Sequence, residues 1–246
     1  VGYRSLFHIL DERGWKWLQM SWPYVDLPRG ASSLDVAGAA LHRLQGEHAF
    51  AYIHLPSLDS LGHRYGPGSI PVQRAIEETD RLCEMLTSRM LELHRDPVIV
   101  FAGDHGMVSV VKSVDVCCAL ERTQLRFGRE VVYFVDSTMV RCWFFTARAK
   151  RLVTGALEEL GCGHWITREE RRGWGLEGLP ECNGEEFFLA DPGVVFSPSF
   201  FSSDVRQAPR GMHGYAPEFL DNQAIFIAHR PRACWGGSVG RIGGSI

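Results

Sequence analysis

The sequence predicts an α/β fold, built on a mostly parallel sheet with helices on both faces and carrying a small α+β insertion. Short apolar runs such as Val98 to Ala102 have the length and β-branched content of strands buried on both faces of a parallel sheet. An amphipathic helical pattern over residues 71–93 connects two such runs, as in a βαβ unit. Carboxylates and imidazoles follow directly after the runs, at the edge where α/β sheets bind ligands.

The pattern changes in the middle of the chain, and this change predicts the domain organisation. Residues 1–110 and 202–246 are expected to form an α/β core that carries these carboxylates and imidazoles. Residues 111–201, which read as paired antiparallel strands with one or two helices, are expected to form an inserted α+β subdomain. A length of 246 residues is sufficient for a core domain with such an insertion.

Capping residues and turn residues bound the expected elements of the N-terminal part. A first helix follows Ser5 as its N-cap and ends at Gly14, and a second has Ser33 as its N-cap and ends near Arg43. Apolar runs at 15–22 and 49–55 read as strands. The long helix 71–93 places its apolar side chains, methionines included, on one stripe that faces a core. That stripe contains Val72, Ala75, Ile76, Leu82, Met85, Leu86 and Met90.

The inserted region and the C-terminal part are divided by similar signals. Two antiparallel strands are expected at 130–135 and 139–145, followed by a helix at 147–160 that Gly161 ends. The remaining expected elements are a strand at 164–167, a helical turn at 168–172, a small hairpin formed by 185–190 and 193–196, and a buried strand at 222–228.

Three short segments carry the candidate ligands. Asp104 and His105 end the Val98 strand between two glycines, which permit close approach of backbone or ligand. Asp59 and His63 stand four residues apart, so one helical turn would direct both to a common point. His213 lies in a glycine-flanked loop before the last expected strand. Each segment alone also fits a structural explanation, namely a capping Asp or a surface His.

Taken together, these oxygen and imidazole donors favour a metal site. Five ligands are too many for one tetrahedral ion with an open position, but they suit two ions about 3.5–4 Å apart, an arrangement used for displacement at phosphorus. Zinc or manganese fits the donor set. The sequence therefore predicts two divalent metal ions, most simply zinc, with manganese as the alternative.

The same segments carry a resemblance to a known family. Three segments resemble, in sequence and in order, the metal motifs of the alkaline phosphatase superfamily, specifically its type I phosphodiesterase/nucleotide pyrophosphatase branch. They are residues 52–67, Gly103 to Met107 and Gly211 to Tyr215. The resemblance implies an alkaline-phosphatase-like fold. It also implies that Asp59, His63 and His213 hold one zinc and that Asp104 and His105 hold the other.

The chain departs from the family pattern at three points. Family members have an N-terminal strand that supplies a further Asp to the second metal, and a Thr or Ser at a helix start that is the nucleophile. Neither is found before Asp59, since Ser21, Ser32 and Ser33 do not follow a strand with an Asp at the family's spacing. Ala216 also stands where members often have Asp. We therefore assign no nucleophile and expect an intact enzyme that is longer at both ends.

The resemblance implies a metal-dependent hydrolase of phosphodiester or pyrophosphate bonds that acts on a small-molecule phosphodiester or nucleotide. Two alternatives remain open: an inactive metal-binding remnant, and a phosphomonoesterase or phosphonate hydrolase of the same superfamily. A net charge of −3 with interspersed signs argues against extended nucleic acid as a partner. No apolar run is long enough to span a membrane. Seven cysteines without a CxxC pair favour reduced thiols and a cytoplasmic location, and the oligomeric state is left open.

Overall fold

A computed structural model describes residues 4–21, 27–200 and 208–231 of the chain. These residues divide into two compact units. The first unit comprises the described residues up to Leu61, residues 69–101 and the residues from Phe226 onward. The second unit comprises residues 62–68 and 102–225. The predicted division at residues 110/111 and 201/202 stays a prediction.

The first two helices of the first unit are set by serine caps. Helix α1 (Leu6–Glu12) begins after Ser5, whose hydroxyl accepts the backbone N–H of His8, as predicted. Helix α2 (Ser33–Arg43) is capped by Ser32 through the N–H of Asp35, so the prediction of Ser33 as the cap was wrong by one residue. Ser33 is instead buried, and its hydroxyl accepts the N–H of Ser57.

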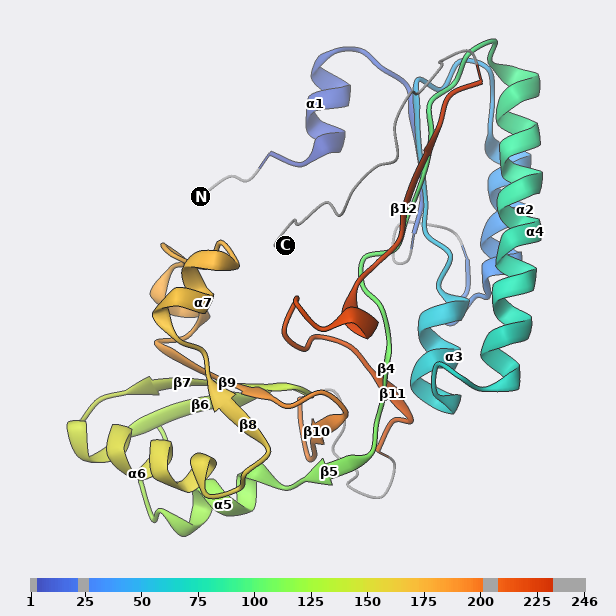
Figure 1. The fold of residues 1–246 in the computed structure, drawn as a ribbon. Coiled ribbons are helices and arrows are strands. Elements are labelled where there is room, and N and C mark those ends of the chain that lie inside the picture. The colour runs from blue at the N-terminus through green and yellow to red at the C-terminus, as the bar shows by residue number, and fades with distance from the viewer. Residues whose placement is uncertain (1–3, 22–26, 201–207, 232–246) are drawn as a thin grey trace. The chain divides into compact units, whose positions relative to one another are not determined.

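Parallel strands β1 (Trp17–Met20) and β2 (Phe50–Ile53) form the sheet against which α2 packs. Figure 1 shows α2 and the long helix α4 (Ile70–Leu93) side by side along this sheet. The two helices and the strands share one apolar core, which holds the unit together by burial of aliphatic side chains. That core contains Met20, Val36, Ala37, Ala40, Leu44, Leu82 and Leu86.

The apolar stripe of α4 is only partly buried. Val72, Ala75, Leu82 and Leu86 face the interior as predicted, but Ile76 and Met85 are exposed. The prediction of these two residues as core was wrong, because a 24-residue helix needs only a narrow stripe to cover strands of four residues.

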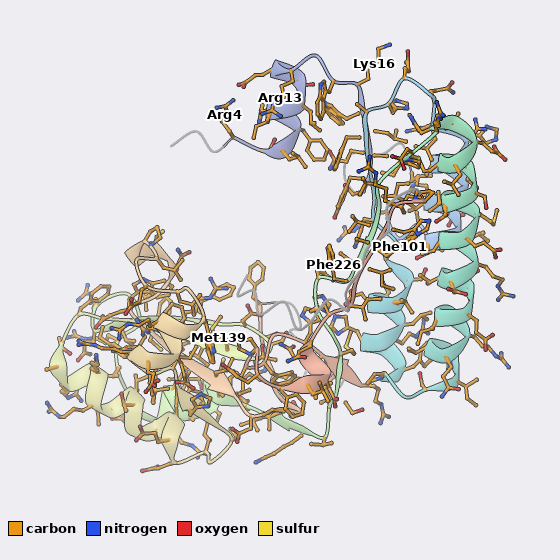
Figure 2. The ribbon with its side chains drawn as sticks, turned by 45° about the horizontal axis from the view of Figure 1, so that its top comes forward. Arg4, Arg13, Lys16, Phe101, Met139 and Phe226 are labelled. Atoms are coloured by element: carbon orange, nitrogen blue, oxygen red, sulfur yellow. The ribbon has the colours of Figure 1, made fainter. Side chains whose placement is uncertain are left out.

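Strands β3 (Ile99–Ala102) and β12 (Phe226–His229) pair with each other. Figure 2 labels Phe101 and Phe226, one aromatic side chain on each of the two strands. Both strands were predicted to be buried, and this was wrong: β3 alternates between partly buried and exposed residues, and all of β12 is exposed. The apolar runs were read correctly as strands, but apolar composition alone does not report whether a second layer covers a strand.

The second unit is built around a four-stranded antiparallel sheet in the order β6-β7-β9-β8. Helices α5 (Val116–Arg122) and α6 (Ala147–Glu158) contribute apolar side chains to the core on one of its faces. The sheet strands are β6 (Val131–Val135), β7 (Met139–Phe144), β8 (Gly163–Trp165) and β9 (Glu186–Ala190). These strands and helix α6 confirm the elements predicted from the inserted region.

One predicted pairing in this unit was wrong. The runs at 185–190 and 193–196 do form strands, but β9 pairs with β7 and β8, while β10 (Val194–Phe196) pairs in parallel with β5 (Lys112–Val114). Asp191, Pro192 and Gly193 therefore carry the chain out of the sheet and do not close a hairpin. Helix α7 (Arg168–Gly173) and the 3₁₀ turn η1 (Glu181–Asn183) lie between β8 and β9 in the sequence.

The α/β class is confirmed, but one continuous, mostly parallel sheet is not. In the described ranges the strands outside the four-stranded sheet form separate pairs, of which β1 with β2 and β10 with β5 are parallel. No helix within those ranges is long and apolar enough to cross a membrane. All cysteines in the described part of the chain are free thiols, including the buried Cys142 and Cys162.

Candidate metal centre

Helix α3 (Ser57–Tyr65) carries the first pair of predicted ligands. Asp59 lies in its first turn and His63 in its last, so the predicted helical relation between them is confirmed. The backbone N–H of Arg210 donates to the carbonyl of His63 at 2.7 Å. The C-terminal turn of the helix is thereby tied to the segment that leads to His213.

The second pair of predicted ligands lies in the loop after β3. The side chain of Asp104 is 77% exposed, and that of His105 is 25% exposed. The backbone N–H of His105 donates to Asp104 Oδ1 at 3.1 Å, which fixes the carboxylate beside its neighbour. The loop then enters strand β4 (Val108–Ser109).

The third segment reaches the same place by strand pairing. Strand β11 (Gly211–Met212) pairs antiparallel with β4, so that Met212 lies opposite Val108. His213 follows directly after β11. Tyr215 anchors the far end of the segment, because its buried hydroxyl donates to the carbonyl of Val194 at 3.0 Å. Burial raises the pKa of Tyr215 to about 12, so the donor keeps its proton at neutral pH.

These three segments bring their histidines together. The rings of His105 and His213 stack at a centroid distance of 3.5 Å with 14° between their planes. The rings of His63 and His213 lie 5.1 Å apart at 50°. We call residues 62–66, 103–107 and 210–215 the histidine junction. Residues separated by up to 150 positions in the sequence thus meet, as the sequence predicted.

Two of the three imidazoles are oriented by backbone carbonyls. Nδ1 of His63 lies 2.8 Å from the carbonyl oxygen of Gly211, and Nδ1 of His105 lies 2.9 Å from that of Gly106. A carbonyl oxygen only accepts, so each Nδ1 carries a hydrogen. In the neutral ring the lone pair is then on Nε2, the arrangement in which protein histidines coordinate metals. The hydrogen bonds at Nδ1 thus leave the Nε2 atoms of His63 and His105 available as ligands of a divalent cation.

The carboxylates complete the donor set in different ways. His105 Nε2 lies 3.6 Å from Asp104 Oδ2, so the two predicted ligands of the second ion are neighbours. Asp59 is carried by the same continuous helix as His63. Which residues share an ion stays a prediction.

Met107 fills the space between two glycines of the junction. A Cβ atom added at Gly62 would lie 2.8 Å from Met107 Cε, and one added at Gly211 would lie 3.0 Å from Met107 Cγ and Sδ and 2.5 Å from the carbonyl oxygen of Gly62. Real Cβ atoms do not approach so closely. Glycine is therefore required at Gly211, where the clash is with backbone, whereas a side chain at Gly62 would displace the end of Met107.

Gly106 allows an equally close approach on the other side of the loop. An added Cβ there would overlap the carbonyl oxygen of Asp221 and lie 2.7 Å from that of Gln223. These oxygens belong to and follow the 3₁₀ turn η3 (Leu220–Asn222). Sequence reasoning identified the glycines of the motifs but did not identify Met107 as the side chain that two of them contact. This role depends on contacts between distant segments, and no local sequence signal indicates it.

Comparison with known proteins places the chain in a family. Residues 11–143, more than half of the chain, match the family described as "Type I phosphodiesterase / nucleotide pyrophosphatase". The chain belongs to this family, and the resemblance seen in the sequence is confirmed.

Two curated relatives are consistent with that assignment. Venom phosphodiesterase 2 and venom phosphodiesterase 1 of Crotalus adamanteus are each 23% identical to the chain in an alignment of 197 positions that covers 74% of this chain. The chain spans about a quarter of the length of these relatives: 23% of the first and 22% of the second.

The solved structures support the fold. Murine ectonucleotide pyrophosphatase/phosphodiesterase 5, in an inactive form in complex with AMP, superposes with a TM-score of 0.63 at 18% identity, covering 90% of this chain and 62% of that one. The human protein gives a TM-score of 0.63 at 18% identity, covering 89% and 61%. At this level of identity the likeness shows the fold alone.

Proposed function

We propose that this chain is the metal-binding part of a hydrolase of phosphodiester or pyrophosphate bonds, of the nucleotide pyrophosphatase/phosphodiesterase type. The observation that carries the proposal is the convergence of three imidazoles, two of them held by carbonyls at Nδ1. Membership of the family supports it. The AMP in a structural neighbour supports a nucleotide as the substrate.

In this proposal Asp59, His63 and His213 hold one zinc or manganese ion, and Asp104 and His105 hold a second. Such ions, when bound, lower the pKa of an attacking hydroxyl or water and neutralise charge on phosphoryl oxygens. The contribution of the chain is to fix its ring nitrogens before substrate arrives. The Gly211 and Gly106 carbonyls keep the rings of His63 and His105 from rotating, so little reorganisation is needed on binding.

The nucleophile of the proposed reaction lies outside the residues described. Ser32 caps α2, and Ser33 is buried against Ser57, so both hydroxyls serve the local structure. Ser21 accepts a hydrogen bond from the side chain of Gln19. Because these three hydroxyls have local structural roles, they support the second candidate, a metal-binding remnant without turnover. A phosphomonoesterase or phosphonate hydrolase remains the third.

The test is an assay of the full-length natural protein with bis(p-nitrophenyl) phosphate and with p-nitrophenyl phosphate, each with and without a chelator. We expect chelator-sensitive hydrolysis of the diester in preference to the monoester. His213→Ala should lower turnover of the diester by at least about 100-fold, because it removes a ligand of the proposed centre. His164→Ala is the matched control, since His164 pairs with Glu170 on α7.

The outcomes separate the three candidates. Preferential hydrolysis of the monoester would replace the diesterase assignment with a monoesterase. Metal binding without turnover of either compound would favour the remnant. Equal activity of the His213→Ala and His164→Ala variants would contradict any role of the histidine junction in the reaction.

A further inference from the structure

Asn222 is the residue that contacts both histidine-bearing loops of the junction through hydrogen bonds. It ends the 3₁₀ turn η3, just before the chain enters β12. Its backbone carbonyl accepts the N–H of Gly106 at 2.9 Å, next to His105. Its side-chain amide reaches the other loop, next to His213. The residue therefore joins two segments that the sequence separates by more than 100 positions.

The side-chain amide of Asn222 uses both of its ends on the His213 loop. Oδ1 accepts the N–H of Gly214 at 3.1 Å, and Nδ2 donates to the carbonyl of Tyr215 at 3.1 Å. The backbone N–H of Asn222 donates to Phe219, which holds the turn itself in shape. Only an amide offers an acceptor and a donor at this spacing, so the residue type is specific to the arrangement.

The backbone around Asn222 packs directly against the His105 loop. Gly106 has no room for a side chain, because the backbone of residues 221–223 lies against it. Gly103 adds a second attachment, since its N–H donates to the carbonyl of Ile225 at 3.0 Å. The segment around Asn222 is thus fixed to the His105 loop along its length, and its amide is the part that extends to His213.

We propose that Asn222 is a positioning residue that sets the separation of His105 and His213 and thereby the affinity of the junction for a divalent cation. The part of the inference that concerns metal affinity rests on the proposed function. The separation of the two rings does not, because it is a property of the chain alone. Without the amide, the Gly214 peptide keeps its attachment to Thr138, whose hydroxyl donates to the Gly214 carbonyl at 2.9 Å. The His213 loop then stays attached to Thr138 and, through β11, to β4, but it loses the side-chain bridge to the segment that lies against Gly106.

Asn222→Leu, measured in the full-length natural protein, tests this inference, because leucine has a similar shape and forms no hydrogen bonds. Zinc affinity is measured by competition with a chromophoric chelator. The separation of the two rings is measured from nuclear Overhauser effects between their protons in metal-free protein with labelled histidine. We expect a 10- to 100-fold loss of zinc affinity and loss of the ring contact, with the melting temperature of the metal-free protein nearly unchanged.

Two further variants make the result specific. Asn222→Asp keeps an acceptor for Gly214 but loses the donor to Tyr215, so its affinity should lie between those of wild type and Asn222→Leu; it also serves if the leucine variant fails to fold. Thr138→Val removes one hydrogen bond from the same Gly214 peptide without touching the link to His105. It should keep the ring contact and the zinc affinity.

The inference is wrong if Asn222→Leu retains the ring contact, or if Thr138→Val loses it to the same degree. A wild-type protein that binds no zinc would instead contradict the proposed function. In that case the ring contact still decides whether Asn222 positions the histidines.

Discussion

The histidine junction and the four-stranded sheet lie in the same unit, but different interactions order them. The sheet is held by an apolar core in which Val140, Cys142, Leu157 and Phe188 are fully buried. The junction is held by hydrogen bonds to backbone groups and by glycines without space for a side chain. A core adapts to small losses of volume, whereas backbone contacts at van der Waals distance do not adapt to an added atom.

The largest effect is expected from adding one carbon atom to the histidine junction. Gly106→Ala places a Cβ on the carbonyl oxygen of Asp221, so the loop must move away from η3. We expect this variant to show no measurable zinc binding. Its unfolding free energy should fall by about 5 kcal/mol or more, because overpacking against backbone is severe. Calorimetric zinc titration and urea unfolding measure the two effects. A variant that binds zinc normally would show that the junction is looser than its contacts indicate.

Removing a large core side chain should affect stability alone. Phe188 is fully buried between β7 and β8, and its ring contacts Trp165 and Phe196. Phe188→Ala should lower the unfolding free energy by about 3–5 kcal/mol, measured by urea unfolding. Zinc affinity below the transition should stay within about threefold of wild type, because Met212 and Tyr215, the junction residues that share this core, are also held by strand β4 and by the Val194 carbonyl. Phe145→Ala, at an exposed aromatic, is the control and should cost little.

Alkaline pH should weaken the sheet through a buried thiol. Burial, with smaller contributions from Glu186 and Glu185, raises the pKa of Cys142 to about 12. Because the folded pKa lies above that of the unfolded thiol, the stability is fully present below about pH 8.5 and is lost as pH rises toward 12. Urea unfolding between pH 8 and 11 should show this decline, and Cys142→Ala should reduce its slope. An unchanged slope would assign the decline to other groups, such as Tyr215.

The smallest effect is the same glycine-to-alanine change placed in the other region. Gly155 lies in α6 with nothing within 4 Å of an added Cβ and has ordinary helical backbone angles. Gly155→Ala should therefore raise the unfolding free energy by about 0.5–1 kcal/mol, because alanine favours the helix. Thermal unfolding measures the gain. A loss in place of a gain would mean that the helix packs more tightly than the structure indicates.

The two regions also differ in how far the sequence predicted them. Strands β6 and β7 and helix α6 were placed to within a residue or two, because alternation and helical periodicity are local signals. The hairpin expected for 185–196 failed, because the parallel partner of β10 is the distant segment Lys112–Val114. Exposure of β3 and β12 failed for a related reason, since the composition of a strand does not say what covers it.

The ligand-bearing residues were predicted better than their supports. His63, His105 and His213 lie close together, and the glycines around them leave the room for close approach that was expected of them. The residues that hold the rings were missed. Asn222 and Met107 act through contacts with segments far away in the chain, and asparagine in a turn or methionine after a strand is too common to indicate such a contact.

The position of Met107 between two glycines has a consequence for how such sequences diverge. Gly62 on α3 and Gly211 on β11 both press against the same thioether, so the three positions share one fixed volume. A relative with alanine at 62 should compensate by a shorter side chain at 107, and a relative with a bulkier residue at 107 should keep glycine at both. Glycine at 211 is expected in either case, because an added Cβ there would also meet the carbonyl oxygen of Gly62. Drift at these three sites is therefore expected to be correlated, with the histidines unchanged.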